Sequence, residues 1–440
     1  MAYYDAVSPA WHDAMQAKGH KISFYEAFDF CVTVWVLYPL LLLKGIEKDN
    51  KISLLSEKLM GTVINVIESW DRLNMYVSEA MGTWQYTSML HDLFKIGVIS
   101  GYKPAVDRVI QQVDEILLPF AESIAFLFPL SFDTRTLKKY GNGDNYAIAG
   151  LFASLMLSIH EYTADEKYKK AAASAINVLY NLPANSSLQE SFLTSYGVIS
   201  ALQLYTLTSN DKYIATAKYL LAQNLRLAYW YNDRTGARFD CFNLLGMFQA
   251  CTPMLYPAFL ENSMCLTVLS GIFRHMVPQK GLLRLFNLGR INNFYMFPKC
   301  MPEKYHITKS LYIPYENLGT LEDDKMGYVG QEIYGSGGVF WFYMLWEAFA
   351  VCDNKDIMVM ALDLFKDNTP DASLTNSMFI VYNPLEEAVD AKIRFNHIKQ
   401  GAYALTGIDP LSLNSRIELD GDLINIPIKP DEYVYVKIMA

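Results

Sequence analysis

The sequence has little charge, and what it has is predominantly acidic. Charged residues make up 19% of the 440 residues, and 46 acidic side chains against 37 basic ones give a net charge of −9. Nucleic-acid binding needs a basic surface, so this balance excludes a nucleic-acid partner from our expectations. The hydrophobic fraction of 52% is too high for a disordered chain. We therefore expect a folded protein larger than one typical domain.

Signatures of metal and cofactor binding are also missing. The six cysteines form no Cys-x-x-Cys pair, and the seven histidines show no zinc-ligand spacing. Cys31 and Cys352 have apolar neighbours, which is typical of free, buried thiols in a reducing compartment. No P-loop, HExxH or Ser-His-Asp signature occurs. We expect no metal and no cofactor.

No hydrophobic run is long enough to span a membrane. The strongest, residues 31–43, has about 13 residues where a span needs roughly 20, and it contains Pro39. The first fifteen residues are polar and aromatic, unlike a secretory signal peptide. The expectation is a cytoplasmic protein without a membrane partner, or a secreted one if a leader was removed. A homo-oligomer is left open.

Residues 20–366 read as helices that come in pairs. The clearest pair covers residues 146–162 and 167–180, and its first helix is apolar nearly all round while its second is amphipathic. The same helix–turn–helix pattern recurs 45 residues later, where Thr208-Ser-Asn-Asp-Lys-Tyr213 repeats the turn Thr163-Ala-Asp-Glu-Lys-Tyr168. Looser copies begin near residues 28, 84, 260 and 340, and the last leads into an expected helix over 356–365.

The connections between these helices are unequal in length. Turns within a pair are short, whereas the connections between pairs are long: 71–83, 131–145, 183–192, 228–260 and 290–338. Long loops inside a compact domain are usually functional. An open superhelix of repeats would keep a regular period and short loops at both ends. The asymmetry favours a closed toroid with one elaborated end.

The composition changes after Pro370. Short β-branched and aromatic runs alternate with turn signals such as Asn383-Pro384 and Asp420-Gly421. This pattern predicts a small antiparallel β-sandwich. The expected fold is mostly α, with an (α/α)6 toroid of helical hairpins over 1–370 and a sandwich domain over 371–440.

This order resembles the (α/α)6-toroid carbohydrate-active enzymes, both glycoside hydrolases and polysaccharide lyases. The resemblance rests on the hairpin GNGDNYAIAGLFASLMLSIHEYTADEKYKKAA from Gly141 and on the ending FIVYNPLEEAVDAKIRF to YVYVKI. It concerns architecture over nearly the whole chain and matches no single family's catalytic motif. It implies a carbohydrate substrate, and because fold does not fix function, the site residues must come from the sequence itself.

In a toroid, the long loops and the starts of the inner helices converge, so we expect the site residues there. The loop 312–338 is the richest: Glu332 and Glu316 lie among aromatic residues and glycines. Glycosidic hydrolysis needs two carboxylates, one of them an acid with a raised pKa. Asp144 and Asp240 are the other candidate catalytic carboxylates. As ordinary structural groups, Asp144 would cap a helix and Glu316 would pair with a surface lysine.

The candidate substrate-binding residues offer flat aromatic faces, amides or charge-assisted hydrogen bonds. They are Trp84, Tyr86, His91, Tyr146, Trp230, Arg238, Tyr315, Gln331 and Tyr334. His91 lies one or two turns inside its helix. Its alternative role is structural, as a buried side chain whose hydrogen bonds are made within the core.

We expect a glycoside hydrolase that uses carboxylate acid/base catalysis on an oligosaccharide or polysaccharide. The first alternative is a lyase that cleaves a uronate-containing glycan by β-elimination. Its acid and base would come from Tyr146, Tyr196, Tyr334 and His91, with Arg238 neutralising the uronate. A non-catalytic glycan-binding or scaffold protein is the second alternative. A lyase for a hydrophobic substrate such as a terpenoid would need a drier funnel than these loops predict.

Overall fold

A computed structural model describes residues 3–5, 10–12, 25–44, 50–69, 81–183, 190–230, 244–249, 259–296, 350–362, 378–395, 404–406, 416–418 and 423–439. Within them the protein is mostly helical, with small antiparallel sheets. The helices form successive hairpins: α2 (Tyr25–Lys44) with α3 (Asn50–Ser69), α4 (Thr83–Ser100) with α5 (Lys103–Gln112), α7 (Ile148–Thr163) with α8 (Glu166–Asn181), α9 (Ser191–Thr208) with α10 (Asp211–Leu225), and α11 (Phe259–Ser270) with α12 (Lys280–Met296).

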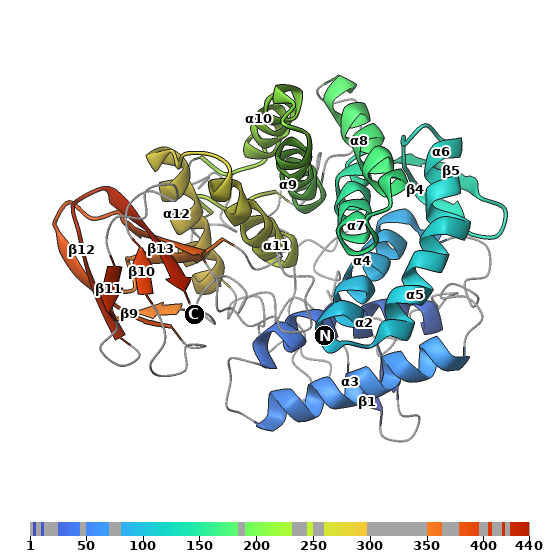
Figure 1. Cartoon of the computed structure of the whole chain (residues 1–440), viewed down its shortest axis with the longest axis horizontal. Coiled ribbons are helices and arrows are strands. Elements are labelled where there is room, and N and C mark those ends of the chain that lie inside the picture. Colours follow the sequence, from blue (N-terminus) through green and yellow to red (C-terminus); the bar gives the residue numbers. More distant parts are fainter. Residues whose placement is uncertain are drawn as a thin grey trace, which may run out of the picture.

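The first helices of the hairpins pack on one another in chain order. α2 contacts α4, α4 contacts α7, α7 contacts α9 and α9 contacts α11. We call these five the inner helices, and Figure 1 shows the hairpins following one another along an arc. Side chains that join α4 to α9 therefore cross the interior of this arc. The paired helices predicted from apolar periodicity are confirmed for these hairpins.

The internal repeat predicted from the two matching turns is confirmed in detail. Asp165 accepts a hydrogen bond from the backbone N–H of Lys167 at 2.9 Å, and Asn210 accepts one from Lys212 at 3.0 Å. Each caps the start of the second helix of its hairpin. The residues that end the first helices, Ala164 and Ser209, adopt left-handed φ values of 58° and 53°.

The inner helices α7 and α9 approach each other closely at a pair of glycines. A Cβ on Gly150 would lie 2.5 Å from the carbonyl oxygen of Leu193 and 2.6 Å from the backbone nitrogen of Gly197. Only a residue without a side chain fits between the two backbones. This contact keeps the starts of the two helices together.

A three-stranded sheet precedes the inner helices at their starting end. Its strands are β3 (Met81–Gly82), β4 (Pro129–Asp133) and β5 (Lys138–Asp144), and β4 and β5 form a hairpin. The connection 131–145 expected as a loop is thus largely a β-hairpin that delivers the chain to α7. α5 continues through a π-helical turn (Val113–Leu117) into α6 (Leu118–Ser123), and a separate pair, β1 (Tyr3–Asp5) and β2 (Ala10–His12), lies near the N-terminus.

The C-terminal strands form two antiparallel sheets. Five strands lie in the order β11 (Arg416–Glu418), β10 (Ala404–Thr406), β13 (Glu432–Met439), β8 (Met378–Asn383) and β7 (Met358–Ala361). The other sheet has β12 (Leu423–Ile428), β9 (Val389–Phe395) and β6 (Ala350–Cys352). Phe379 of the first sheet meets Phe395 of the second edge to face, with ring centroids 4.9 Å apart. The prediction of antiparallel strands after Pro370 is confirmed.

One predicted helix is wrong. Residues 356–365 were expected to form an amphipathic helix, but Met358–Ala361 is the strand β7 and pairs with β8. All four residues of β7 are buried, and a short apolar run of this kind does not distinguish a strand from a helix by its period. Because β6 and β7 precede residue 371, both sheets include chain from before the predicted division at 370/371, which itself stays a prediction.

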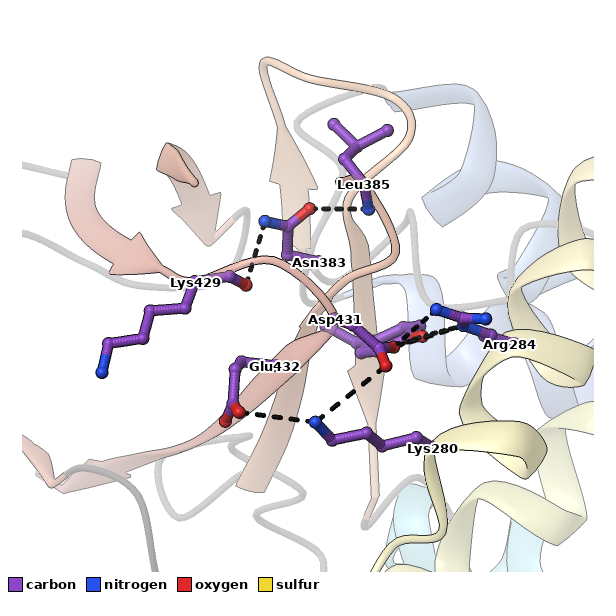
Figure 2. Close-up of polar contacts among 8 residues, drawn as sticks. Lys280, Arg284, Asn383, Leu385, Lys429, Asp431 and Glu432 are labelled. Carbon is purple, nitrogen blue, oxygen red and sulfur yellow. Dashed lines mark hydrogen bonds and ion pairs between the residues drawn. The ribbon is translucent and has the colours of Figure 1, made fainter. Parts of the chain in front are cut away.

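The five-stranded sheet is attached to α12, in the last helical hairpin of the described residues, by charged and polar side chains (Figure 2). Arg284 of α12 contacts Asp431 at 3.1 Å, and Lys280 lies 3.4 Å from Glu432. The hydroxyl of Tyr382 donates to Asp431 at 2.7 Å. Asp431 has a left-handed φ of 52°, a conformation that Asp adopts more readily than most residues. The tight turn before β13 thus presents a carboxylate to α12.

Among the described helices, including the apolar α2, none combines the length and hydropathy needed to cross a membrane. Cys265 and Cys352 are free thiols, and Cys31 is buried as expected, whereas Cys352 is only partly buried. Cys265 is fully buried, and burial raises its pKa to about 12.

Candidate functional site

The starts of α4, α7 and α9 meet at one end of the inner helices, and we call this region the mouth. Two contacts define it. Trp84, at the start of α4, meets Phe192 of α9 edge to face with ring centroids 5.7 Å apart. Asn145, just before α7, donates from Nδ2 to Oε1 of Glu190, just before α9, at 2.7 Å. The predicted convergence of inner-helix starts is therefore present for these three helices.

Asp144 reaches the mouth at the end of β5 and does not cap α7. Helix α7 begins at Ile148, and its N-cap residue Ala147 makes no side-chain cap. One carboxylate oxygen of Asp144 contacts the ammonium of Lys139 at 2.6 Å, and the other accepts from the hydroxyl of Tyr146 at 3.3 Å. Burial and the neighbouring Asp144 raise the pKa of Tyr146, which keeps this hydroxyl protonated. Two predicted site residues, Asp144 and Tyr146, thus contact each other.

Asn145 is fully buried beside this pair. Its backbone N–H donates to the carbonyl of Phe128 at 3.0 Å, and its amide nitrogen binds Glu190. Its side-chain oxygen, Oδ1, has no hydrogen-bond partner within the described part of the chain. A buried amide oxygen without a partner loses its hydration, so this atom is available to a donor from water or ligand.

Trp84 lies in an aromatic cluster at the mouth. Its ring stacks on that of Trp35 from α2, with centroids 5.2 Å apart and an interplanar angle of 4°. Its remaining contact with Phe192 comes from across the arc. Trp84 is only partly buried. Its predicted role as a sugar platform stays a prediction.

Tyr86 lies on a different side of α4 from Trp84. Two residues along a helix correspond to about 200° of rotation, and Tyr86 accordingly packs toward α5. It is fully buried, its hydroxyl donates to Gln112 at 3.3 Å, and its ring contacts Phe132. The structure therefore places Tyr86 between α4 and α5, apart from the other candidates on α4.

His91 lies two turns inside α4, within the arc. Its Nδ1 is 2.8 Å from Oδ1 of Asp92, and its Nε2 is 3.2 Å from the hydroxyl of Ser154 on α7. Because a carboxylate only accepts hydrogen bonds, Nδ1 carries a proton here. The edge of the His91 ring meets Tyr196 of α9, with centroids 5.2 Å apart. His91 and Asp92 are each only 2% exposed.

Neutral polar side chains continue this interior toward α11. The Ser195 hydroxyl lies 3.1 Å from the Cys265 sulfur, and Asn224 donates to Ser195 at 2.8 Å. Several further buried atoms have no hydrogen-bond partner among the described residues: Thr83 Oγ1, Ser191 Oγ, Asn224 Oδ1, Asn262 Nδ2 and Asn293 Oδ1.

Trp230 is not brought into this arrangement. Trp230, after α10, is 56% exposed, and its indole nitrogen donates to the carbonyl of Leu225 at 2.9 Å. The remaining predicted residues lie outside the described ranges: Glu316, Glu332, Asp240, Arg238, Tyr315, Gln331 and Tyr334. Within the described residues no group of three His, Cys, Asp or Glu side chains is arranged to hold a metal ion.

Two carboxylates were missed by the sequence analysis. Glu190 was overlooked inside the connection 183–192, although it lies 45 residues after Asn145 and so occupies the equivalent place in the repeat. Asp92 was overlooked because it directly follows His91 in an apolar helix. The signal in the sequence was a charged pair, Asp92 and Lys95, in a helix that is otherwise buried nearly all round.

No protein-family model matches the chain, and no curated protein matches it. Solved structures of similar fold include a cellobiose 2-epimerase from Bacillus thermoamylovorans, with 10% identity, 71% of this chain and 86% of that chain covered, and a TM-score of 0.46. A GH76 alpha-mannanase from Bacteroides thetaiotaomicron has 12% identity, covers 77% and 90%, and has a TM-score of 0.48. A GH127 beta-L-arabinofuranosidase from Geobacillus stearothermophilus has 10% identity, covers 96% and 74%, and has a TM-score of 0.41.

By their names the three are carbohydrate enzymes. The similarity concerns the course of the backbone and assigns no residue of this chain.

Proposed function

We propose that the protein is a glycoside hydrolase whose active site opens at the mouth. In this proposal the helical hairpins close into an (α/α)6 toroid, and the C-terminal sheets form a sandwich beside it. The observation that carries the proposal is the meeting of three inner-helix starts, which brings Asp144 and Glu190 to one region with the indole of Trp84. Glycosidic hydrolysis uses a pair of carboxylates, and an aromatic face offers a flat surface on which a sugar ring can pack.

Asp144 is proposed as one of the two catalytic carboxylates. Its contacts with Lys139 and Tyr146 fix the orientation of both oxygens, which a base or nucleophile needs. The second carboxylate comes from Glu190 or from the loop that contains Glu316 and Glu332. The bond to Asn145 holds Glu190 by one oxygen. Asp240 stays a further candidate for that carboxylate. Arg238, Trp84, Tyr146, Tyr315 and Tyr334 complete the proposed sugar contacts.

The test is a panel of oligosaccharides and polysaccharides, with reducing ends and the ultraviolet absorbance of unsaturated uronates followed together. We expect new reducing ends without absorbance. Asp144→Asn should lower the rate by at least about a hundredfold, the usual contribution of a general acid or base. Asp133→Asn, in the β4–β5 turn, is the matched control and should leave the rate near that of the native protein.

The same assay assigns the second carboxylate through Glu190→Gln, Glu332→Gln and Glu316→Gln. A hundredfold loss in one of these variants, together with unchanged folding by circular dichroism, identifies it. If Asp144→Asn keeps full activity while reducing ends are produced, the placement of the site at the mouth is wrong.

A uronate lyase is the second candidate, favoured by the contact between His91 and Tyr196 in the arc. Burial, with the charge of Asp92, raises the pKa of Tyr196 well above its ordinary value, so its phenol stays protonated. In this candidate mechanism Tyr196 supplies the proton and His91 acts as the base. Rising absorbance in the panel would support this reading against hydrolysis. Glycan binding without any turnover would support a binding protein instead.

A further inference from the structure

Asp92 is a buried carboxylate in the middle of an inner helix. It belongs to α4 and is 2% exposed. Oδ1 accepts a hydrogen bond from Nδ1 of His91 at 2.8 Å. Its second oxygen, Oδ2, is buried and has no hydrogen-bond partner within the part of the chain that the structure describes. One oxygen of this carboxylate is thus held by a hydrogen bond, and the other makes none within the described residues.

The groups that face Asp92 come from several inner helices. On α4 they are His91 and Lys95, which favour its charged form, and Lys95 is itself only 5% exposed. Tyr38 of α2 and Tyr196 of α9 feel the charge of Asp92, which adds to the effect of burial in raising their pKa values. Despite these two neighbours, burial dominates and raises the pKa of Asp92 above its ordinary value. Ionised Asp92 is therefore unfavourable for folding near neutral pH.

A buried carboxylate that stabilises the fold would accept hydrogen bonds at both of its oxygens. Buried ion pairs repay their desolvation only when further hydrogen bonds satisfy the remaining lone pairs, and here Oδ2 makes none. We propose that Asp92 is a ligand-binding residue, and that Oδ2 accepts a hydrogen bond from a hydroxyl of the bound sugar inside the arc of inner helices. This inference rests on the proposed function, because a sugar is the ligand that it names.

The position of Asp92 fits a sugar that enters from the mouth. Trp84 marks the mouth on α4, and His91 and Asp92 lie two turns further along the same helix, which is roughly 10 Å. His91, which holds Asp92, also contacts Ser154 of α7 and the ring of Tyr196 of α9. A ring with several hydroxyl groups supplies the donor that Oδ2 lacks, whereas an apolar ligand would leave it unpaired.

The first experiment separates a ligand contact from a structural role without any substrate. Asp92→Asn keeps the shape and removes the charge, and we expect the Tm at neutral pH to rise by at least about 1 °C. Asp114→Asn is the matched control. Asp114 accepts hydrogen bonds from Lys167 at 3.0 Å and from Tyr168 at 2.9 Å, so the Tm of the Asp114→Asn variant should fall. A Tm that falls in Asp92→Asn would overturn the proposal, because the carboxylate would then stabilise the fold.

The second experiment measures binding by calorimetry, with D-glucose, D-mannose, D-xylose and D-glucuronate as the probes. For the sugar that binds the native protein, Asp92→Asn should weaken Kd at least tenfold, while Asp114→Asn leaves it unchanged. Equal binding by Asp92→Asn overturns the proposal and leaves the proposed function standing. If the native protein binds none of the sugars and releases no reducing ends, the proposed function fails, and the sugar ligand of Asp92 fails with it.

Discussion

Asn145 and Glu190 hold the same position in two copies of one helical hairpin, and their side chains bind each other. They are 45 residues apart in the chain, and each lies just before an inner helix. The amide Nδ2 of Asn145 donates to Oε1 of Glu190 at 2.7 Å. A repeat that duplicates a helix start thus also creates a contact between the two copies, and this contact closes one side of the mouth.

This pair should contribute measurably to stability. Asn145→Ala removes a hydrogen bond to a charged acceptor and leaves Glu190 without this partner, so the free energy of unfolding should fall by about 2 kcal/mol. Urea unfolding measures this free energy, and a double-mutant cycle with Glu190→Gln isolates the coupling between the two side chains. The control is Asn181→Ala, which removes an exposed amide on α8 and should change the free energy of unfolding by less than about 0.5 kcal/mol. Equal losses in the two alanine variants would contradict a special role for the pair.

Two glycines in helices should respond to alanine in opposite directions. Gly150→Ala forces a methyl group against the backbone of α9, 2.5 Å from an oxygen, and should lower the free energy of unfolding by about 2 kcal/mol or more. Gly61→Ala on α3 meets nothing within 4 Å and should raise it by about 0.5–1 kcal/mol. Denaturant unfolding measures both, and a stabilised Gly150→Ala protein would show that the close helix contact is absent.

The stability of the protein should depend on His275 below pH 6.5. Burial, with the charge of Arg274, lowers the pKa of His275 from 6.5 to about 4. The unfolded chain therefore binds a proton in this window that the folded chain does not, and stability falls as the pH drops from 6.5 toward 4. His275→Gln should unfold with a shallower dependence on pH over this range. A parallel dependence in both proteins would show that His275 is not the titrating group.

The attachment of the five-stranded sheet to α12 should weaken in acid. The hydrogen bond from Tyr382, helped by the charges of Arg284 and Lys280 and opposed by burial, holds the pKa of Asp431 below 3.8. A carboxyl group with a lowered pKa stabilises the fold above its unfolded pKa, and this contribution is lost as the pH falls below it. Asp431→Asn should therefore lower the free energy of unfolding most at neutral pH and least near pH 3.

Because Asp431 is partly exposed, the loss at neutral pH should stay below about 1 kcal/mol. Asn retains the left-handed backbone that this position needs, so the variant tests the charge alone. Unfolding by urea at the two pH values gives the comparison, with Glu387→Gln in the exposed β8–β9 turn as control. A difference between native protein and Asp431→Asn that does not shrink in acid would contradict this assignment.

Sequence reasoning determined the helical hairpins and their repeat. The apolar face of α7 continues nearly all round the helix, and matched turns end at Tyr168 and Tyr213, so local pattern alone predicts a buried first helix and a covering second one. It also placed Asp144 and His91 near the starting ends of inner helices. These are properties of local sequence, because helix periodicity and capping depend on residues within a few positions.

Only the tertiary structure decided which distant groups meet. Met358–Ala361 has a period that suits either helix or strand, and pairing with β8 made it a strand. Glu190 joins the mouth because α7 and α9 pack closely at Gly150. Asp92 interacts electrostatically with Tyr38 and Tyr196 because α2 and α9 both contact α4. Contacts between residues that are distant in the chain depend on how the helices pack. The local sequence around a side chain therefore does not predict its neighbours across the arc.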